Sequence, residues 1–216
     1  MSTPLTDSIN ALTAYANETT GASDATLSDA VHTLASGYGG GDSSTVIVDD
    51  NTRYFRMDST DPSGTVARLF AYRPVEVVYL GGFKDFSSSS YMFEFMPNLK
   101  AVILPSATKL PSYMFWDNIS THSIPTIDIY QKQAFSSATV FRLDQGGNVI
   151  LRNTEMSTTG FTATTWGVSN GIKFYVPSAL RANYLADANW GTFGSDRILP
   201  IEGSPYENID WWKSLT

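Results

Sequence analysis

Histidine, the residue most often used in acid–base catalysis and metal binding, is scarce in this chain. Only His32 and His122 are present, and neither has other candidate ligands at the spacing of a metal site. A serine triad needs a positioned nucleophile beside a histidine and an aspartate, and an abundance of serine does not indicate one. We therefore predict no catalytic residues, and the chain is expected not to be an enzyme.

Two further segments invite chemical interpretations. Residues 58–64, with the sequence Asp-Ser-Thr-Asp-Pro-Ser-Gly, lack the alternating oxygen ligands and the distant Glu of a calcium-binding loop. A turn explains these residues better. The glycines between 37 and 41 are not followed by Lys and Ser or Thr, so they do not form a phosphate-binding loop. No metal site and no cofactor are expected.

The composition is typical of a folded chain with an acidic surface. Of its 216 residues, 42% are hydrophobic, which is enough for a sizeable core, and the net charge is −7. Nucleic acid would require a basic face and anionic lipid a polybasic segment, so neither is an expected partner. No apolar run approaches the ~20 residues of a membrane span, so membrane insertion is not expected. Residues 1–20 do not resemble a signal peptide, and the chain has no cysteine for disulfides.

The first 44 residues differ in character from the rest. Apolar residues at helical spacing predict two short helices within residues 1–36. Helices this short need a packing partner, so we interpret 1–36 as an attachment or oligomerisation segment. Residues 37–44, rich in glycine, are predicted to be a flexible linker. The remainder divides into a repeat region, 45–203, and an aromatic tail, 204–216.

Short β-type runs recur through the repeat region at a nearly constant interval. Their central apolar residues, spaced by 23, 24, 25, 22 and 25 residues, are Phe55, Val78, Val102, Ile127, Val149 and Phe174. A series of β-hairpins does not require a constant interval. A solenoid does, because each of its turns has a similar length and adds one strand to a parallel sheet. Tyr91 and Phe93 recur as Tyr113 and Phe115, and we expect such aromatic residues to fill the core opposite the sheet.

A stripe of candidate binding residues is predicted on the outer face of this sheet, because side chains alternate along a strand. The stripe consists of Tyr79, Ile103, Asp128, Ile150 and Tyr175. Two interpretations remain open. Either the stripe is exposed and marks a site for a ligand or partner, or flanking sequence covers it.

Tryptophan supplies the other candidate binding residues. Trp116 and Trp166 lie in predicted turns, where their rings could stack on sugars, contact a protein partner or pack in the core. Trp211 and Trp212 lie in the tail. An aromatic tail of this kind is expected to fold back on the repeat region or to dock on a neighbouring chain.

A longer unit runs from Tyr91 to Pro105 and has the form Tyr-Met-Phe-x-x-Met-x-x-Leu-x-x-Val-x-Leu-Pro. It resembles the BspA-like leucine-rich repeat, roughly Ala-Phe-x-x-Cys-x-x-Leu-x-x-Ile-x-Ile-Pro, with Met96 where that family often has Cys. The resemblance implies an α/β, β-rich fold: a leucine-rich-repeat solenoid with a parallel β-sheet, preceded by a short N-terminal α-helical hairpin. Gly146 and Gly171 depart from the pattern, because each replaces an apolar residue three positions before a strand.

Both ends of the chain resemble repeat proteins encoded in phages and prophages of gut bacteria. Residues 174–190, which end in Asn189-Trp190, are similar to the end cap of those proteins, and residues 26–41 are similar to their opening. The resemblance implies a structural or accessory protein, associated with the virion or its tail, or present in the bacterial cytoplasm before lysis. The partners it implies are protein, either this chain itself or virion components, and host-surface glycan or protein. A bacterial cell-surface adhesin is the alternative, and a polysaccharide-active enzyme is a more distant one.

Overall fold

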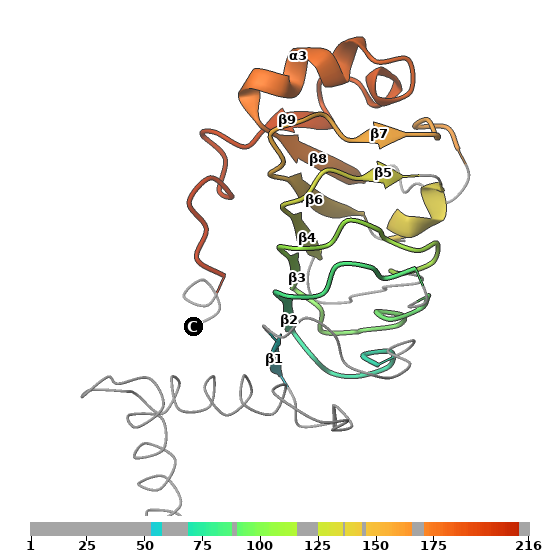
Figure 1. The fold of residues 1–216 in the computed structure, drawn as a ribbon, viewed down its shortest axis with the longest axis vertical. Coiled ribbons are helices and arrows are strands. Elements are labelled where there is room, and N and C mark those ends of the chain that lie inside the picture. The colour runs from blue at the N-terminus through green and yellow to red at the C-terminus, as the bar shows by residue number, and fades with distance from the viewer. Residues whose placement is uncertain are drawn as a thin grey trace, which may run out of the picture.

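The computed structural model describes residues 53–57, 69–87, 90–115, 125–135, 137–143, 146–165 and 171–211. The helical segment predicted for 1–36 and the linker predicted for 37–44 lie outside these ranges, as do both histidines and residues 58–64. Within the described ranges the protein is a mixed α/β structure, built on a seven-stranded parallel sheet with few helices (Figure 1).

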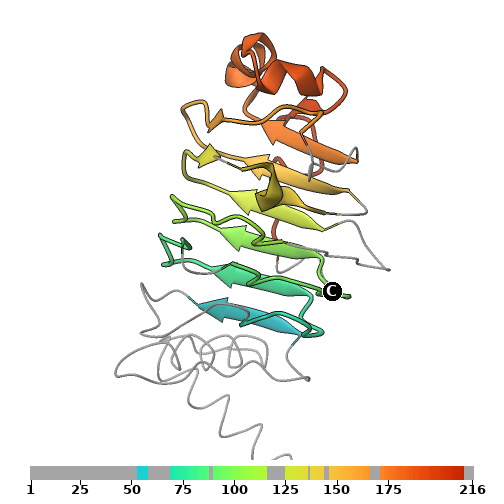
Figure 2. The ribbon, with the colours of Figure 1, turned by 90° about the vertical axis from the view of Figure 1, so that its right-hand side faces the viewer.

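The strands of the main sheet follow one another in chain order, and every neighbouring pair is parallel. They are β1 (Tyr54–Met57), β2 (Val77–Leu80), β3 (Ala101–Leu104), β4 (Thr126–Ile129), β6 (Gly147–Leu151), β8 (Ile172–Val176) and β9 (Ile198–Pro200). A second, two-stranded parallel sheet pairs β5 (Ala134–Phe135) with β7 (Thr158–Thr159). Figures 1 and 2 show the strands of the main sheet stacked along the long axis, with the return segments on one side of the sheet.

The register of the strands confirms the predicted inward positions. Each residue of the predicted series is aligned with the next, in the order Phe55, Val78, Val102, Ile127, Val149 and Phe174. Phe174 is aligned in turn with Ile198 of β9, which extends the series by another 24 residues (198 minus 174). The sequence pattern does not predict β9, because this strand has three residues and ends in Pro200.

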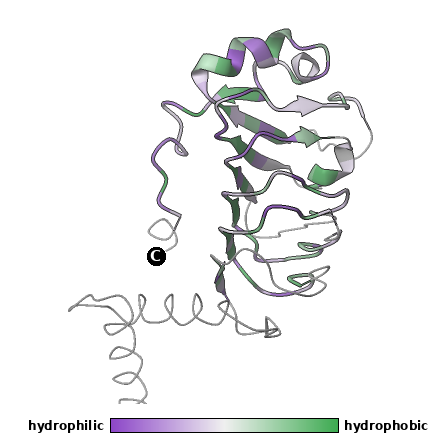
Figure 3. Ribbon diagram, in the orientation of Figure 1, coloured by the Kyte–Doolittle hydropathy of each residue, from purple (hydrophilic) through white to green (hydrophobic). Residues whose placement is uncertain are grey.

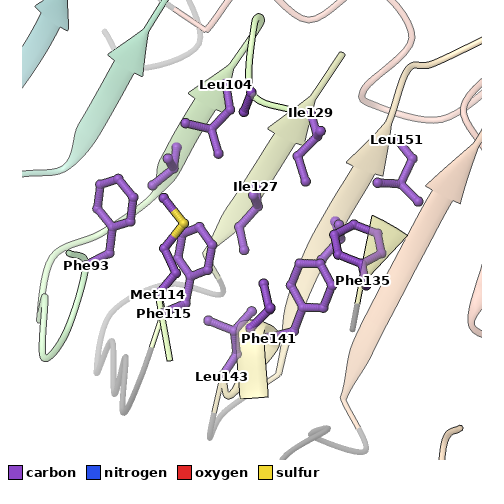
Figure 4. Close-up of a cluster of buried hydrophobic side chains, with 14 of the residues drawn as sticks. Phe93, Leu104, Met114, Phe115, Ile127, Ile129, Phe135, Phe141, Leu143 and Leu151 are labelled. Atoms are coloured by element: carbon purple, nitrogen blue, oxygen red, sulfur yellow. The ribbon is translucent and has the colours of Figure 1, made fainter. Parts of the chain in front are cut away.

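The hydrophobic core lies between the sheet and the return segments, and aromatic rings of neighbouring turns stack within it. Ring centroids are 5.4 Å apart for Phe70 and Phe93 and 5.1 Å apart for Phe93 and Phe115, with interplanar angles of 10° in both pairs. Tyr91 stacks on Tyr113 at 5.5 Å. Figure 4 shows aromatic rings of the return segments packed together with aliphatic side chains of the strands. The prediction that aromatic residues fill the core opposite the sheet is confirmed for Phe93 and Phe115, whereas Tyr91 and Tyr113 are half-buried and lie outside the core cluster.

The two glycines that depart from the repeat pattern lie against each other on neighbouring turns. Gly146 has a φ of +85°, and a Cβ atom at this position would lie 2.9 Å from the backbone of Gly171. The buried side chain of Leu143 lies beside Gly147 and fills part of the core at this turn. Glycine therefore permits an approach of two turns that a side chain would prevent.

The C-terminal end of the core is closed by helix α3 (Ser178–Ala186), the 3₁₀ helix η2 (Trp190–Phe193) and β9 (Figure 1). Trp190 is completely buried, and its Nε1 donates a hydrogen bond to Ser157 O at 2.8 Å. Ser157 N in turn donates to the Tyr184 hydroxyl at 2.8 Å. The Trp190 ring also packs against Phe174, with centroids 5.0 Å apart. Trp190 is thus a core residue that joins the cap to the last turns of the sheet.

The remaining helix in the described ranges is η1 (Ala138–Phe141), which leads into β6. Its first turn is capped by Ser137, whose hydroxyl accepts a hydrogen bond from Thr139 N at 3.3 Å. None of the helices that the structure describes combines the length and the apolar character that crossing a membrane requires.

Replacement of Trp190 by Ala should lower the free energy of unfolding by about 3–5 kcal/mol, because it leaves a large cavity and an unpaired carbonyl at Ser157. Urea denaturation followed by circular dichroism measures this change. Lys173→Ala, at an exposed position of β8, is the matched control and should change the free energy by no more than about 0.5 kcal/mol. Equal effects of the two substitutions would contradict a structural role for the cap.

Candidate functional site

The outward-facing residues of the main sheet form one continuous row across its seven strands. The alignment of neighbouring strands places them in the order Arg56, Tyr79, Ile103, Asp128, Ile150, Tyr175 and Leu199. All five residues of the predicted stripe belong to this row. The structure therefore brings them together as the alternation of side chains predicts.

The stripe is not an exposed surface. Asp128 and Ile150 are completely buried and Ile103 is nearly so, while Tyr79 and Tyr175 are half-buried. The cause is the segment after β9, residues 202–211, which we call the C-terminal strap. It runs along the outer face of the sheet in the direction of strand stacking (Figure 1). Of the two interpretations of the stripe, coverage by flanking sequence is confirmed.

The strap meets the outer face at three successive levels. Over β8, the ring of Tyr206 packs edge-on against Tyr175, with centroids 4.7 Å apart. Beyond the end of β6, Nη2 of Arg152 donates a hydrogen bond to the carbonyl of Tyr206 at 2.6 Å. Over β4, Nε1 of Trp211 donates to Oδ2 of Asp128 at 2.8 Å. The strap thus crosses the strands instead of pairing with them.

Trp211 also covers the apolar part of the face formed by β2 and β3. Its ring packs against a small cluster of buried residues made up of Val77, Ala101 and Ile103. The indole suits this position, because one edge donates a hydrogen bond while the ring body contacts apolar side chains. The prediction that the tail folds back on the repeat region is confirmed for the described part of the tail.

Asp128 is the buried ionisable residue of the site. It lies between Ile103 and Ile150 in the row, and burial raises the pKa of its carboxyl group. Hydrogen bonds from Arg152 and Trp211 act in the opposite direction on this pKa. Nε of Arg152 lies 2.8 Å from Oδ1 and 3.1 Å from Oδ2, so the carboxylate has a cation directly against it.

Arg152 is the functional residue of this site that sequence reasoning missed. Its guanidinium contacts the Asp128 carboxylate, the carbonyl of Tyr206 and the ring of Tyr130, whose centroid lies 5.4 Å from Cζ. A signal was present in the sequence, because Arg152 follows Asp128 by 24 residues, which is one repeat interval. Opposite charges at that separation lie on neighbouring turns at nearly the same level.

The other candidate residues cannot be placed relative to this arrangement, because they fall in segments that the structure does not describe. Trp116, Trp166 and Trp212 lie outside the described residues. Residues 167–171 match the Gly-x-Ser-x-Gly form of a nucleophile elbow. An elbow places its serine between a strand and a following helix, whereas this segment leads directly into strand β8. Residues 166–170 lie outside the described ranges, so the position of Ser169 is not described.

Comparison of the chain with protein-family models, curated proteins and solved structures gives no match. The resemblance to BspA-like repeats and to phage-encoded proteins therefore stays a prediction. In the ranges that the structure describes, no group of three or more His, Asp or Glu side chains is placed to hold a metal ion.

Arg152→Ala should lower the free energy of unfolding by about 3–5 kcal/mol, because it leaves a buried carboxylate without its cation. Lys132→Ala is the matched control: Lys132 and Glu155 form an ion pair between neighbouring turns at 2.7 Å, but both side chains are more than half exposed. Its removal should have no measurable effect in the same denaturation experiment. Similar losses in both variants would contradict a special role for the buried pair.

The raised pKa of Asp128 predicts a pH dependence with a definite sign. The folded protein retains the proton at pH values where the unfolded chain, with a pKa near 3.8, has released it. Stability contributed by this group is therefore present below pH 3.8 and is lost as the pH rises through the pKa of the folded state. Asp85, Glu155 and Glu202, whose pKa values are lowered by hydrogen bonds, contribute in the opposite sense.

Comparison with Asp128→Asn separates these contributions, because the other carboxyl groups are common to both proteins. We expect the stability of the wild type relative to this variant to fall as the pH rises from 3 to 7. The measurement is urea denaturation of both proteins across that range. A difference that is constant, or that grows with pH, would show that the hydrogen bonds to Asp128 outweigh its burial.

Proposed function

We propose that this chain is a leucine-rich-repeat solenoid of the BspA-like type that acts as a non-catalytic structural or accessory protein of a phage particle. The observation that carries the proposal is the sheet of seven parallel strands in chain order, with aligned inward residues 22–25 positions apart. A chain that adds one similar turn after another forms an extended scaffold, which is suited to presenting a surface.

The use of charged side chains supports a structural role. Glu76 is bound by Arg53 of the preceding turn at 2.5 Å and by Lys100 of the following turn at 2.7 Å. Asp85 pairs with Lys109, 24 residues later, at 2.8 Å. Carboxylates in these positions link one turn to the next. A polysaccharide-active enzyme would instead need two carboxyl groups facing each other across a groove.

Coverage of the outer face by the strap leaves the return side of the repeats as the better surface for host glycan or protein. Tyr72 is 62% exposed on this side, and its ring stacks on Phe95 of the next turn with centroids 5.1 Å apart. Exposed, stacked rings of this kind suit contact with sugars or with protein side chains. A bacterial cell-surface adhesin, the alternative function, would use the same surface.

Attachment to a larger assembly is assigned to residues 1–36 in this proposal. The full chain should form a defined oligomer in solution, and a chain lacking residues 1–44 should be a monomer that still unfolds cooperatively in urea. Light scattering after size-exclusion chromatography measures both masses. A shortened chain with the same oligomeric state as the full chain, or a full chain that is monomeric, would contradict this assignment.

A further inference from the structure

Backbone strain in this protein is concentrated at aromatic residues. In the ranges that the structure describes, four residues other than glycine have a positive φ, and all four are aromatic: Tyr72 (62°), Tyr91 (62°), Phe95 (49°) and Tyr113 (61°). A side chain makes this left-handed conformation unfavourable, and glycine or asparagine is the usual choice there. Because a ring at such a position has a cost, we expect it to supply something that glycine cannot.

Packing within the chain accounts for three of these rings. Tyr91 and Tyr113 are half-buried and stack on each other, with centroids 5.5 Å apart and an interplanar angle of 5°. Phe95 is also half-buried, and its ring lies 5.1 Å from that of Tyr72. Tyr72 differs, because 62% of it remains exposed, so burial offsets little of its strain. Strain that packing does not offset is typical of functional sites.

Contacts with the next turn hold Tyr72 in a fixed position. Its backbone N–H donates a hydrogen bond to the carbonyl of Glu94 at 3.0 Å, and the N–H of Arg73 donates to the carbonyl of Phe70 at 3.1 Å. Phe95 supports one face of the Tyr72 ring, at an interplanar angle of 26°. The exposed part of the ring is therefore rigid, and binding does not have to immobilise a mobile side chain.

We propose that Tyr72 is a sugar-binding residue: the apolar C–H face of one saccharide unit stacks on the exposed face of its ring. The inference rests on the proposed function and deepens it. It assigns the host-surface ligand to the class of glycans, and it names the side chain that contacts the sugar.

The surroundings of Tyr72 favour a sugar over a protein partner. Protein interfaces are centred on clusters of apolar anchors in well-packed pockets, whereas Tyr72 is a single exposed ring. The other large hydrophobic residues that are exposed in the described ranges are Tyr54 of β1 and Tyr130, which follows β4. Hydrophobic and hydrophilic residues are mixed along the return segments (Figure 3). An isolated ring in mixed surroundings matches a sugar, which has an apolar face and hydroxyl groups at its edge.

Replacement of Tyr72 by Gly separates ligand binding from packing, because it removes the ring and also relieves the strain of a positive φ. We expect full-length Tyr72→Gly to keep the urea midpoint of the wild type. Tyr72→Ala, which loses the ring and keeps the strain, should have a lower midpoint than Tyr72→Gly. A midpoint of Tyr72→Gly clearly below that of the wild type would show that the ring is kept for packing, and would overturn the proposal.

Binding is measured with the full-length wild type on an array of immobilised bacterial-surface and animal glycans, and the strongest ligand is then titrated into the variants. Tyr72→Gly should lower the affinity at least about tenfold, whereas Tyr72→Phe, which retains the ring, should lower it less than about threefold. Tyr54→Ala, which removes an exposed ring from β1, is the matched control and should bind as the wild type does.

Absence of binding to every glycan on the array, or equal affinity of Tyr72→Gly and the wild type, would also overturn the proposal. Equal affinity would place glycan binding at another site and would leave the proposed host-surface function intact. The oligomeric state assigned to residues 1–36 is measured separately and depends on neither result. Failure of this inference is therefore distinguishable from failure of the proposed function.

Discussion

Parallel strands cannot be joined by tight turns, and this constraint determines most of the structure. After each strand the chain must cross to the far side of the core and return before it can begin the next strand in the same direction. An interval of 22–25 residues accomplishes this, and it places equivalent residues of successive turns beside one another. The stacked rings of Phe70, Phe93 and Phe115 and the ion pairs between turns both follow from that alignment.

The same alignment places the outward-facing residues in one row. It also buries a carboxyl group in that row, and this group needs a partner of opposite charge. Asp128 stands between two isoleucines on neighbouring strands, where a carboxylate without partners would be strongly unfavourable. Arg152 comes from the next turn and provides the opposite charge, while the strap provides the indole hydrogen bond and excludes water. The arginine also binds the carbonyl of Tyr206. Pairing of the buried charge and docking of the strap are therefore coupled through one side chain.

Sequence alone predicts the parts of this fold that repeat. The aligned inward residues and the membership of the outer row follow from the spacing of apolar runs and from alternation along each strand, and both are confirmed. The contacts of the strap could not be predicted in the same way, because Trp211 and Asp128 are 83 residues apart and belong to no repeat. Strand β9 was missed because its three residues, which include Pro200, carry too weak a β pattern.

Native-state amide hydrogen exchange of the full-length chain, followed by mass spectrometry, tests the central claim most directly: a stable repeat sheet carries a separable strap. We expect amides of β3, β4, β6 and β8 to exchange only by global unfolding, and those of residues 204–211 to exchange orders of magnitude faster under the same conditions. Exchange of the strap as slow as that of the strands would contradict the account, because the strap would then be an integral part of the cooperative core.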